Sequence, residues 1–337
     1  MDPVSALVTV TNFLLIPAFA YGSQLALGAL GITLIYSILR FSHFAHGDVM
    51  AFGTMVVIFT TWGFQSIGIT GGGVLPTALL AIPVGIVVMI GYLLVADRLV
   101  YRFFRKVKAK PLTFVMASLG VMFITNGLTR LFIGTSERRF EDGERFVFSV
   151  RDFREWTGLA EGLALRSAQF ITIITAVLVM VALFWFLTRT KSGKSMRAYS
   201  DNEDLALLSG INPERVVTMA WVIVASLVVI AGTLYGLDKG FRPINYFQLL
   251  LPMFAAAIVG GLGSPIGAVV GGYVVAFSEM GITFAWRRFF SHLLPDDMAP
   301  AGMVQLLPVD YKFAVTFAIL VLVLVFRPTG IFRGKSI

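Results

Sequence analysis

Long apolar segments separated by short charged loops are the main pattern along this chain of 337 residues. A helix needs about 20 predominantly apolar residues to cross the roughly 30 Å hydrocarbon core of a membrane. Seven segments meet this requirement, so the pattern predicts a membrane protein built from helices. They cover residues from about 20 to 40, 47 to 69, 75 to 96, 111 to 134, 168 to 188, 216 to 237 and 312 to 327.

Two further apolar regions are ambiguous. Residues 4 to 19 join the next segment without an intervening charge, so they form either an interfacial helix or a further crossing. Residues 247 to 286 contain no Lys, Arg or Asp and are too long for a single crossing.

The distribution of charge predicts the orientation. The segment DRLVYRFFRKVKAK at 97 to 110 has six basic residues against one acid, and the C-terminal RPTGIFRGKSI is purely basic, so both should be cytoplasmic. The loop at 135 to 167 mixes both signs and should be periplasmic. Counting crossings from there requires residues 247 to 286 to enter the membrane and leave it again, turning at VGGLGSPIGAVVGG.

We therefore predict an all-α polytopic membrane protein, with residues 1–337 forming a single transmembrane permease domain. It should have about nine membrane segments, with eight to ten possible, the N-terminus out and the C-terminus in. The composition agrees, because 57% of residues are hydrophobic, 14% are charged and the mean hydropathy is +0.84. The 33 Gly and 13 Pro predict broken or closely packed helices. The absence of Cys excludes disulfides and thiolate metal sites.

A charged segment at 188 to 217, TRTKSGKSMRAYSDNEDLALLSGINPERVV, interrupts the apolar pattern. Its SGKS sequence suggests a phosphate-binding loop, which needs a Gly five positions before Gly193, after a buried strand. That position is Thr188, at the end of a predicted membrane helix. We therefore expect no nucleotide site in this chain.

The same segment predicts a short helix. Ser200 and Glu203 have the spacing of a capping box, and Gly210 supplies a left-handed residue that ends a helix. Asn212 and Pro213 are typical of the start of the next helix. The apolar residues between them cannot all face one bundle, so one helix face either meets a partner or rests on lipid headgroups. These residues are Leu205, Ala206, Leu207 and Leu208.

Five motifs, taken in order, resemble the branched-chain amino acid permease family of ABC importers. The resemblance covers nearly the whole chain except the loop at 135 to 167, which is long, and His43 stands where many members have Asn. The motifs are FSHFAHGDVMAFG, VYRFFRKVKAKPLTFVMASLGVMFITNGLTRLFIG, SMRAYSDNEDLALLSGINPERV, AAAIVGGLGSPIGAVVGG and FRPTGIF.

The resemblance implies a permease subunit in the inner (plasma) membrane. It would move branched-chain or related hydrophobic amino acids from a periplasmic binding protein into the cytoplasm by alternating access. Implied partners are two ABC ATPase subunits, a second permease paralogue or a second copy of this chain, the solute-binding protein and membrane lipid, but no nucleic acid. The chain itself would be no enzyme and hold no cofactor, with ATP and Mg used by the ATPase subunits.

The resemblance also assigns the loop at 189–215 as the coupling-helix loop, which docks on an ATPase subunit. The contact residues would be Ser200, Asp201, Glu203, Leu205, Ala206, Leu207, Gly210 and Ile211.

Polar and glycine-rich positions within the spans are candidates for the translocation path. HFAHGD suggests a metal site, but a helix break whose polar side chains satisfy free backbone groups explains it better, and no metal is expected. The glycines of AHGDVMAFGTM and GGLGSPIGAVVGG either line a path or allow close helix packing. A carboxylate or amide within a span either serves the path or forms hydrogen bonds between helices, of which we favour the second. The path candidates are His43, His46, Asp48, Asn126, Gly260, Gly261, Gly263 and Glu279.

Lys239 and Arg242, in the predicted outer loop, either pair with acids of a binding protein or are solvated loop charges. Three alternative functions fit the sequence less well. A self-powered secondary transporter or channel would need a set of coupling-ion ligands or a proton relay, and only one buried-looking carboxylate is present. An intramembrane enzyme would need a nucleophile and a base, yet the chain has three His and no Cys. Within the family, urea or short amides are the alternative cargo.

Overall fold

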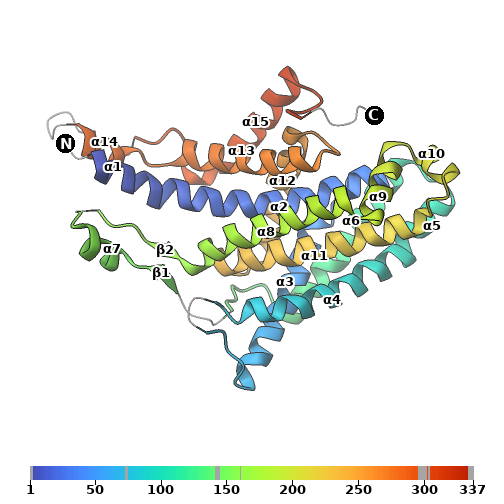
Figure 1. The fold of residues 1–337 in the computed structure, drawn as a ribbon, viewed down its shortest axis with the longest axis horizontal. Coiled ribbons are helices and arrows are strands. Elements are labelled where there is room, and N and C mark those ends of the chain that lie inside the picture. Colours follow the sequence, from blue (N-terminus) through green and yellow to red (C-terminus); the bar gives the residue numbers. More distant parts are fainter. Residues whose placement is uncertain are drawn as a thin grey trace.

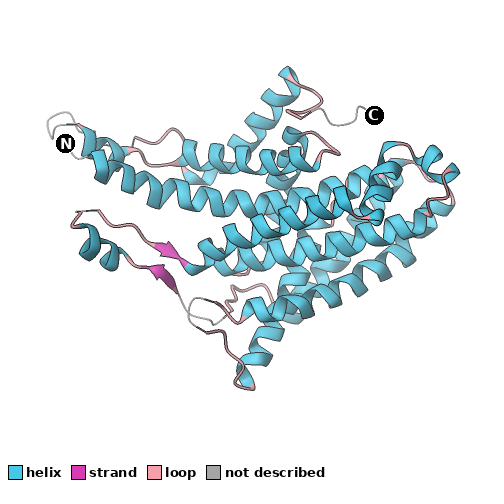
Figure 2. Ribbon diagram, in the orientation of Figure 1, coloured by secondary structure: helices cyan, strands magenta, loops and turns pink. Residues whose placement is uncertain are grey.

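The computed structural model describes residues 3–72, 75–140, 145–159, 161–294, 302 and 304–332. Helices dominate this part of the chain (Figures 1 and 2), as expected where no water is available to satisfy backbone groups. The first half contains α1 (Pro3–Val10), η1 (Thr11–Leu15), α2 (Ile16–Leu39), α3 (His46–Ser66), α4 (Ala78–Ala96), η2 (Asp97–Tyr101), α5 (Arg102–Lys106) and α6 (Pro111–Ile133). The second half contains α8 (Ser167–Arg189), α9 (Lys191–Asp201), α10 (Glu203–Leu208), α11 (Pro213–Lys239), α12 (Pro243–Gly260), α13 (Pro265–Thr283), α14 (Arg287–Leu293), η4 (Val309–Tyr311) and α15 (Lys312–Phe326).

The prediction of about nine membrane segments is confirmed. Within the described ranges, nine helices are long and apolar enough to cross a membrane. Residues 4 to 19 form neither a separate interfacial helix nor a further crossing, because α1, η1 and α2 run on as one helix of 37 residues. At 1.5 Å per residue this helix is longer than a hydrocarbon core of roughly 30 Å.

The ambiguous run at 247 to 286 is two helices, α12 and α13, as predicted. The turn between them uses Gly261 and Gly263, whose φ values are +109° and +85°, a region that other residues rarely adopt. Ser264 then caps α13 by accepting a hydrogen bond from the Gly267 amide at 3.1 Å. The chain's C-terminal segment returns to this turn, where the Phe332 amide donates to the Gly260 carbonyl at 3.0 Å.

The loop at 135 to 167 forms a small lobe rather than an extended connection. In its described part, β1 (Phe146–Phe148) pairs antiparallel with β2 (Leu165–Arg166), and α7 (Val150–Thr157) lies between them. Ser149 and Asp152 form a capping box at the start of α7. The hydrogen bond from the Ser149 amide lowers the pKa of the Asp152 carboxyl, because the ionised carboxylate is the better acceptor for this cap.

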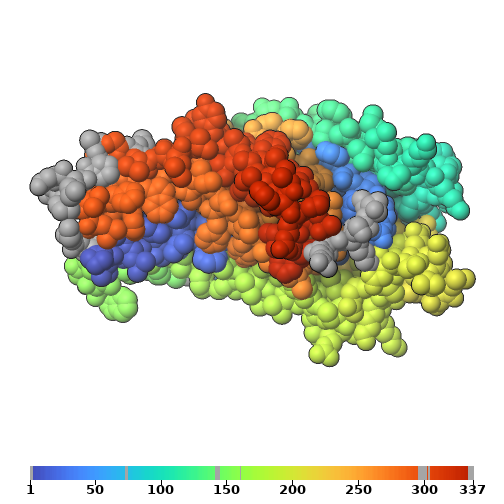
Figure 3. Space-filling view, turned by 90° about the horizontal axis from the view of Figure 1, so that it is seen from above, coloured from blue at the N-terminus to red at the C-terminus, as the bar shows by residue number. Residues whose placement is uncertain are grey.

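The buried centre of the bundle is α2, which packs against α11, α12 and α13. At one end of the molecule α5, α9 and α10 lie together, and at the other end lie α1, α7 and α14 (Figure 1). Figure 3 shows the same separation from above, with the yellow segment around α10 protruding beyond the blue and orange helices. The two charged loops that we expect on opposite sides of the membrane are therefore at opposite ends. The absolute orientation stays a prediction.

Candidate functional site

The charged loop at 189–215 folds into two helices, α9 and α10, rather than one. Thr190 caps α9 by accepting from the Gly193 amide at 3.0 Å, and Asn202 caps α10 by accepting from the Leu205 amide at 3.0 Å. The predicted capping box of Ser200 and Glu203 is wrong, because Ser200 lies in the last turn of α9. Asn202 competes successfully as the N-cap, since its short side chain reaches the amide three residues on.

The predicted end of the short helix is confirmed. Gly210 has a φ of +79°, and the Ile211 amide donates to the Ala206 carbonyl at 3.0 Å, which closes the last turn. Asn212 caps α11 by accepting from the Arg215 amide at 3.3 Å, with Pro213 as the first helical residue. This chain of caps gives α10 a defined position between α9 and α11.

Exposure divides the apolar residues of α10 into two groups. Leu205 and Leu208 are 61% and 85% exposed, whereas Ala206 is 3% exposed and packs into its own bundle. A surface for a partner would therefore be formed by the leucines, and Ala206 would support it from within. The remaining predicted contact residues, Ser200, Asp201, Glu203, Leu207, Gly210 and Ile211, lie on the same helix pair or its exit turn.

One hydrogen bond joins α9 to α10, and a second joins the helix pair to the rest of the molecule. The Tyr199 hydroxyl donates to Glu203 at 2.6 Å, and the Arg40 guanidinium at the end of α2 donates to the Ser200 carbonyl at 2.6 Å. Burial and the hydrogen bond to Glu203 raise the pKa of the Tyr199 hydroxyl, so it remains a donor at physiological pH. The α9–α10 pair is thereby joined to the central helix α2.

A buried polar network lies near the same end and was not predicted. Asp97 accepts two hydrogen bonds from Arg105, at 2.6 and 2.9 Å, and one from the Trp221 indole at 2.8 Å. Arg102 pairs with Glu214 at 3.3 Å. These contacts join η2 and α5 to α11. The available signal was Asp97 itself, the one acid in the basic segment at 97 to 110.

The SGKS sequence has a packing role in this structure. A Cβ at Gly193 would meet the backbone of Phe186 and Leu187 at closer than normal contact distance. The glycine therefore allows α9 to fold back tightly on α8, which accounts for its presence without a bound phosphate.

The HFAHGD motif marks a chain reversal inside the bundle. After Arg40 ends α2 in the left-handed conformation, the chain turns back and α3 begins beside Gly31 of α2. A Cβ at Gly31 would lie 2.6 Å from Cε1 of His46, so the glycine makes room for this imidazole. The Phe44 amide donates to Ser118 of α6 at 3.1 Å, and not to a side chain of the motif.

The polar side chains of this motif point in different directions. The His43 and His46 ring centroids are 6.3 Å apart, and His43 packs among aromatic rings, 5.4 Å from that of Trp221. Asp48 instead accepts a hydrogen bond from Asn126 of α6 at 2.5 Å. In the described part of the chain, no group of three His, Cys, Asp or Glu residues could hold a metal ion. The Asp48–Asn126 bond gives both residues a role between helices.

The glycine-rich run at the α12–α13 turn permits close helix contact. A Cβ at Gly260 would collide with the Gly267 carbonyl, whereas one at Gly263 would meet no atom within 4 Å in the part of the chain that the structure describes. Gly260 is thus required by packing, and Gly261 and Gly263 by the geometry of the turn. Their predicted role along a path stays a prediction.

Glu279 of α13 is nearly fully buried and lines a cavity of about 830 Å³. One carboxylate oxygen, Oε1, accepts a hydrogen bond from the Thr316 hydroxyl of α15, which is an interhelical bond of the kind expected. Lys239 also lines this cavity, whereas Arg242 pairs with Glu137 at 3.4 Å. The structure therefore brings Glu279 and Lys239 to one cavity and leaves His43, Asp48 and Asn126 outside its lining.

Comparison with known proteins gives consistent similarities along the chain. Residues 14–324 match the family described as branched-chain amino acid transport system, permease component. The high-affinity branched-chain amino acid transport system permease protein LivH of Escherichia coli is 30% identical over 315 residues, which are 92% of this chain and 91% of that protein. BraD of Pseudomonas aeruginosa, which has the same description, is 27% identical over 320 residues, 94% of each protein. A probable branched-chain amino acid transport permease protein LivH of Methanocaldococcus jannaschii is 27% identical over 279 residues, 79% of each.

Proposed function

The chain belongs to the family of branched-chain amino acid transport permease components, and from this premise we propose that it is the membrane subunit of an ATP-driven amino acid importer. The observation that carries the proposal is α10, a capped helix outside the nine spans that exposes Leu205 and Leu208. The names of the similar proteins favour branched-chain amino acids as cargo over urea or short amides.

Energy would come from two separate ABC ATPase subunits, which bind ATP and Mg. The interface with an ATPase subunit would form where α10 contacts that subunit's surface. Full burial of a leucine side chain contributes about 1.5–3 kcal/mol, so Leu205 and Leu208 together would supply a substantial part of such an interface.

Movement of α10 would be passed on because the helix pair is held at several points. Tyr199 bonds to Glu203 within the pair, and Arg40 bonds to Ser200 from α2. The exit from α10 leads directly into α11, which the Asp97–Trp221 bond joins to η2. A push on α10 would therefore shift α2, α5 and α11 together, as alternating access requires.

A periplasmic binding protein would deliver the cargo to the end of the molecule opposite α10. Lys239 and Arg242 would be among the charged residues near the face on which this protein docks. Arg242 already pairs with Glu137, so a binding protein would have to compete with that contact. A complete transporter would contain a second permease, either a paralogue or another copy of this chain, in the inner membrane.

ATP-dependent uptake of leucine into proteoliposomes tests this function. Proteoliposomes would contain the permease with its ATPase subunits, and the binding protein would be added outside. We expect uptake that requires enclosed ATP and Mg and that urea does not inhibit. Leucine uptake driven by an ion gradient, without ATPase subunits, would instead identify a secondary transporter and overturn the proposal.

A further inference from the structure

The cavity beside Glu279 lies where the outer ends of several helices meet. Tyr21 comes from the first half of α2, Lys239 from the end of α11, Asn245 from the start of α12 and Lys312 from the start of α15. Our topology places all these ends at the periplasmic side. A ligand released there would meet this cavity before the buried centre of the bundle.

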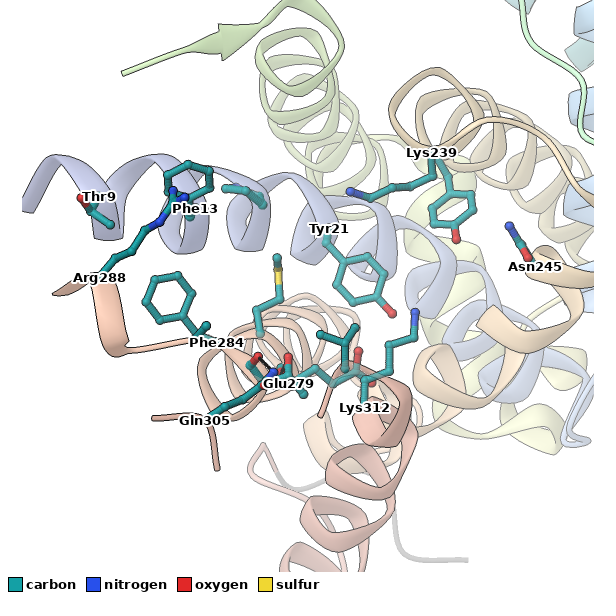
Figure 4. A pocket seen from close by; sticks show the side chains of 16 residues that line it. Thr9, Phe13, Tyr21, Lys239, Asn245, Glu279, Phe284, Arg288, Gln305 and Lys312 are labelled. Carbon is teal, nitrogen blue, oxygen red and sulfur yellow. Dashed lines mark hydrogen bonds between the residues drawn. The ribbon is translucent and has the colours of Figure 1, made fainter. Parts of the chain in front are cut away.

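One end of the cavity holds separated charges of opposite sign. Oε1 of Glu279 accepts a hydrogen bond from Thr316, whereas among the described residues neither Oε2 nor the Tyr21 hydroxyl has a hydrogen-bond partner at normal distance and angle, although this hydroxyl is close enough to interact with the carboxylate. Lys312 is near enough to interact electrostatically with Glu279, and Figure 4 shows Tyr21 and Lys312 directed toward the same space as this carboxylate. A buried carboxylate with an unused oxygen is costly in a membrane and indicates a function.

The other end of the cavity is apolar. Phe13, Met280 and Phe284 line it, and Figure 4 shows Phe13 and Phe284 away from the Lys312 end. Arg288 closes this end with its guanidinium 5.5 Å from the centre of the Phe13 ring. A volume of about 830 Å³ is within the range of sites for small molecules and leaves room for a branched alkyl group.

From this arrangement we infer that the cavity binds the zwitterion of a branched-chain amino acid on its way through the permease. Oε2 of Glu279 and the Tyr21 hydroxyl accept hydrogen bonds from the α-ammonium group, and Lys312 binds the α-carboxylate. The side chain lies between Phe13, Met280 and Phe284. Lys239 is less suited to the carboxylate because it already pairs with Asp238 at 3.2 Å. This inference rests on the proposed function, since it adds a site to that transport path.

The headgroup of phosphatidylethanolamine has the same chemistry, an ammonium group and an anionic oxygen. The test must therefore separate a free amino acid from a lipid. The permease complex with its ATPase subunits, without binding protein, would be placed in nanodiscs of phosphatidylglycerol alone and in nanodiscs that also contain phosphatidylethanolamine.

Binding would be measured by ligand-observed NMR titration with three probes: leucine, 4-methylpentanoate, which lacks the ammonium group, and 3-methylbutylamine, which lacks the carboxylate. Glu279→Gln keeps an oxygen that can accept the hydrogen bond from Thr316. This change should weaken the binding of leucine about tenfold, without affecting the binding of 4-methylpentanoate. Lys312→Met should weaken the binding of leucine to a similar degree, without affecting the binding of 3-methylbutylamine. Glu155→Gln, on exposed α7, is the matched control and should bind all three probes as the wild type does.

Three results would overturn the inference: leucine binding unchanged in both variants, no saturable leucine signal from the wild type up to its solubility limit, or leucine binding abolished by phosphatidylethanolamine. The last result would identify a lipid as the occupant. Leucine uptake by the wild-type proteoliposomes is measured separately. Normal uptake with unchanged binding rejects this site alone, whereas absent uptake rejects the proposed function.

Discussion

Asp97 shows how much a single residue can hold in place at the α10 end of the molecule. Its carboxylate is the shared acceptor for Arg105 and Trp221, and so joins η2, α5 and α11. Removing one member of a buried, hydrogen-bonded charge pair leaves the other charge uncompensated, which costs more than the pair itself contributes.

We expect Asp97→Ala to destabilise the permease by about 3–5 kcal/mol, because the Arg105 guanidinium and the Trp221 indole lose their common partner. The thermal unfolding midpoint of the detergent-purified protein should fall clearly. Glu155→Ala is the control, since it breaks an exposed ion pair with Arg151 and should change stability by less than about 0.5 kcal/mol. Equal midpoints for the two variants would show that the network is unimportant.

Individual residues were predictable where local chemistry decides. Gly210 and Asn212 have the roles that their types suggest, a left-handed helix end and an N-cap. The prediction for Ser200 was wrong because Ser200 and Asn202 are both suitable N-cap residues, and the packing of α9 decides which of them caps α10. The Asp97–Trp221 bond joins residues 124 positions apart, so no local pattern could predict it. The burial of Ala206 was unpredictable for the same reason, because it depends on packing against the rest of the bundle.

At the scale of elements, α10 is the segment on which coupling would depend. It is short and projects from the spans, so its orientation relies on its caps and on the turn at Gly210. The spans themselves were predictable from apolar length alone. The continuity of residues 4–19 with the rest of α2 was not predictable, because an uncharged boundary is compatible with both a continuous helix and a break.

Gly210→Val should reduce leucine-stimulated ATP hydrolysis severalfold while the permease still inserts. A β-branched residue resists a φ of +79°, so the end of α10 would distort where it should meet the ATPase. Space is not the cause, because a Cβ at Gly210 would meet no atom of the described residues within 4 Å.

Gly158→Val is the matched control for this prediction. Gly158 ends α7 with a φ of +69°, and a Cβ there would also meet no described atom within 4 Å, but it lies at the opposite end of the molecule. It should leave the stimulation intact. Equal losses in both variants would mean that general destabilisation, and not coupling, explains the effect. Ala206 is unsuited to this test because it is buried within its own chain.

At the scale of the whole molecule, the two charged loops lie at opposite ends, which is the arrangement that the charge count requires (Figure 1). The close contact of Phe332 with Gly260 puts the C-terminal segment beside the α12–α13 turn, as expected if both are cytoplasmic. The pattern of charges correctly predicted that these two loops lie at opposite ends of the molecule, because each span carries the chain from one end to the other. The cavity at Glu279 was not predictable, since its lining residues come from helices that are far apart in the sequence, from α1 to α15.

The absolute orientation can be measured by labelling single cysteines, because the wild-type chain has none. We expect Lys106→Cys to be protected from an impermeant thiol reagent in spheroplasts and Glu155→Cys to be labelled. Both positions are exposed, so access depends on the side of the membrane. The reverse labelling pattern would place α10 outside the cell, where no ATPase subunit could reach it.

Co-purification of the ATPase subunits with a Leu208→Glu permease tests the central claim, docking of α10, most directly. Leu208 is 85% exposed, so the change should not disturb folding, but it would bury an unpaired charge in the interface. Trp156→Glu, at an equally exposed position on α7 at the opposite end, is the control. We predict that the Leu208 variant inserts normally and loses the ATPase subunits, whereas the Trp156 variant retains them. A Leu208→Glu permease that retains its full complement of ATPase subunits would contradict the account.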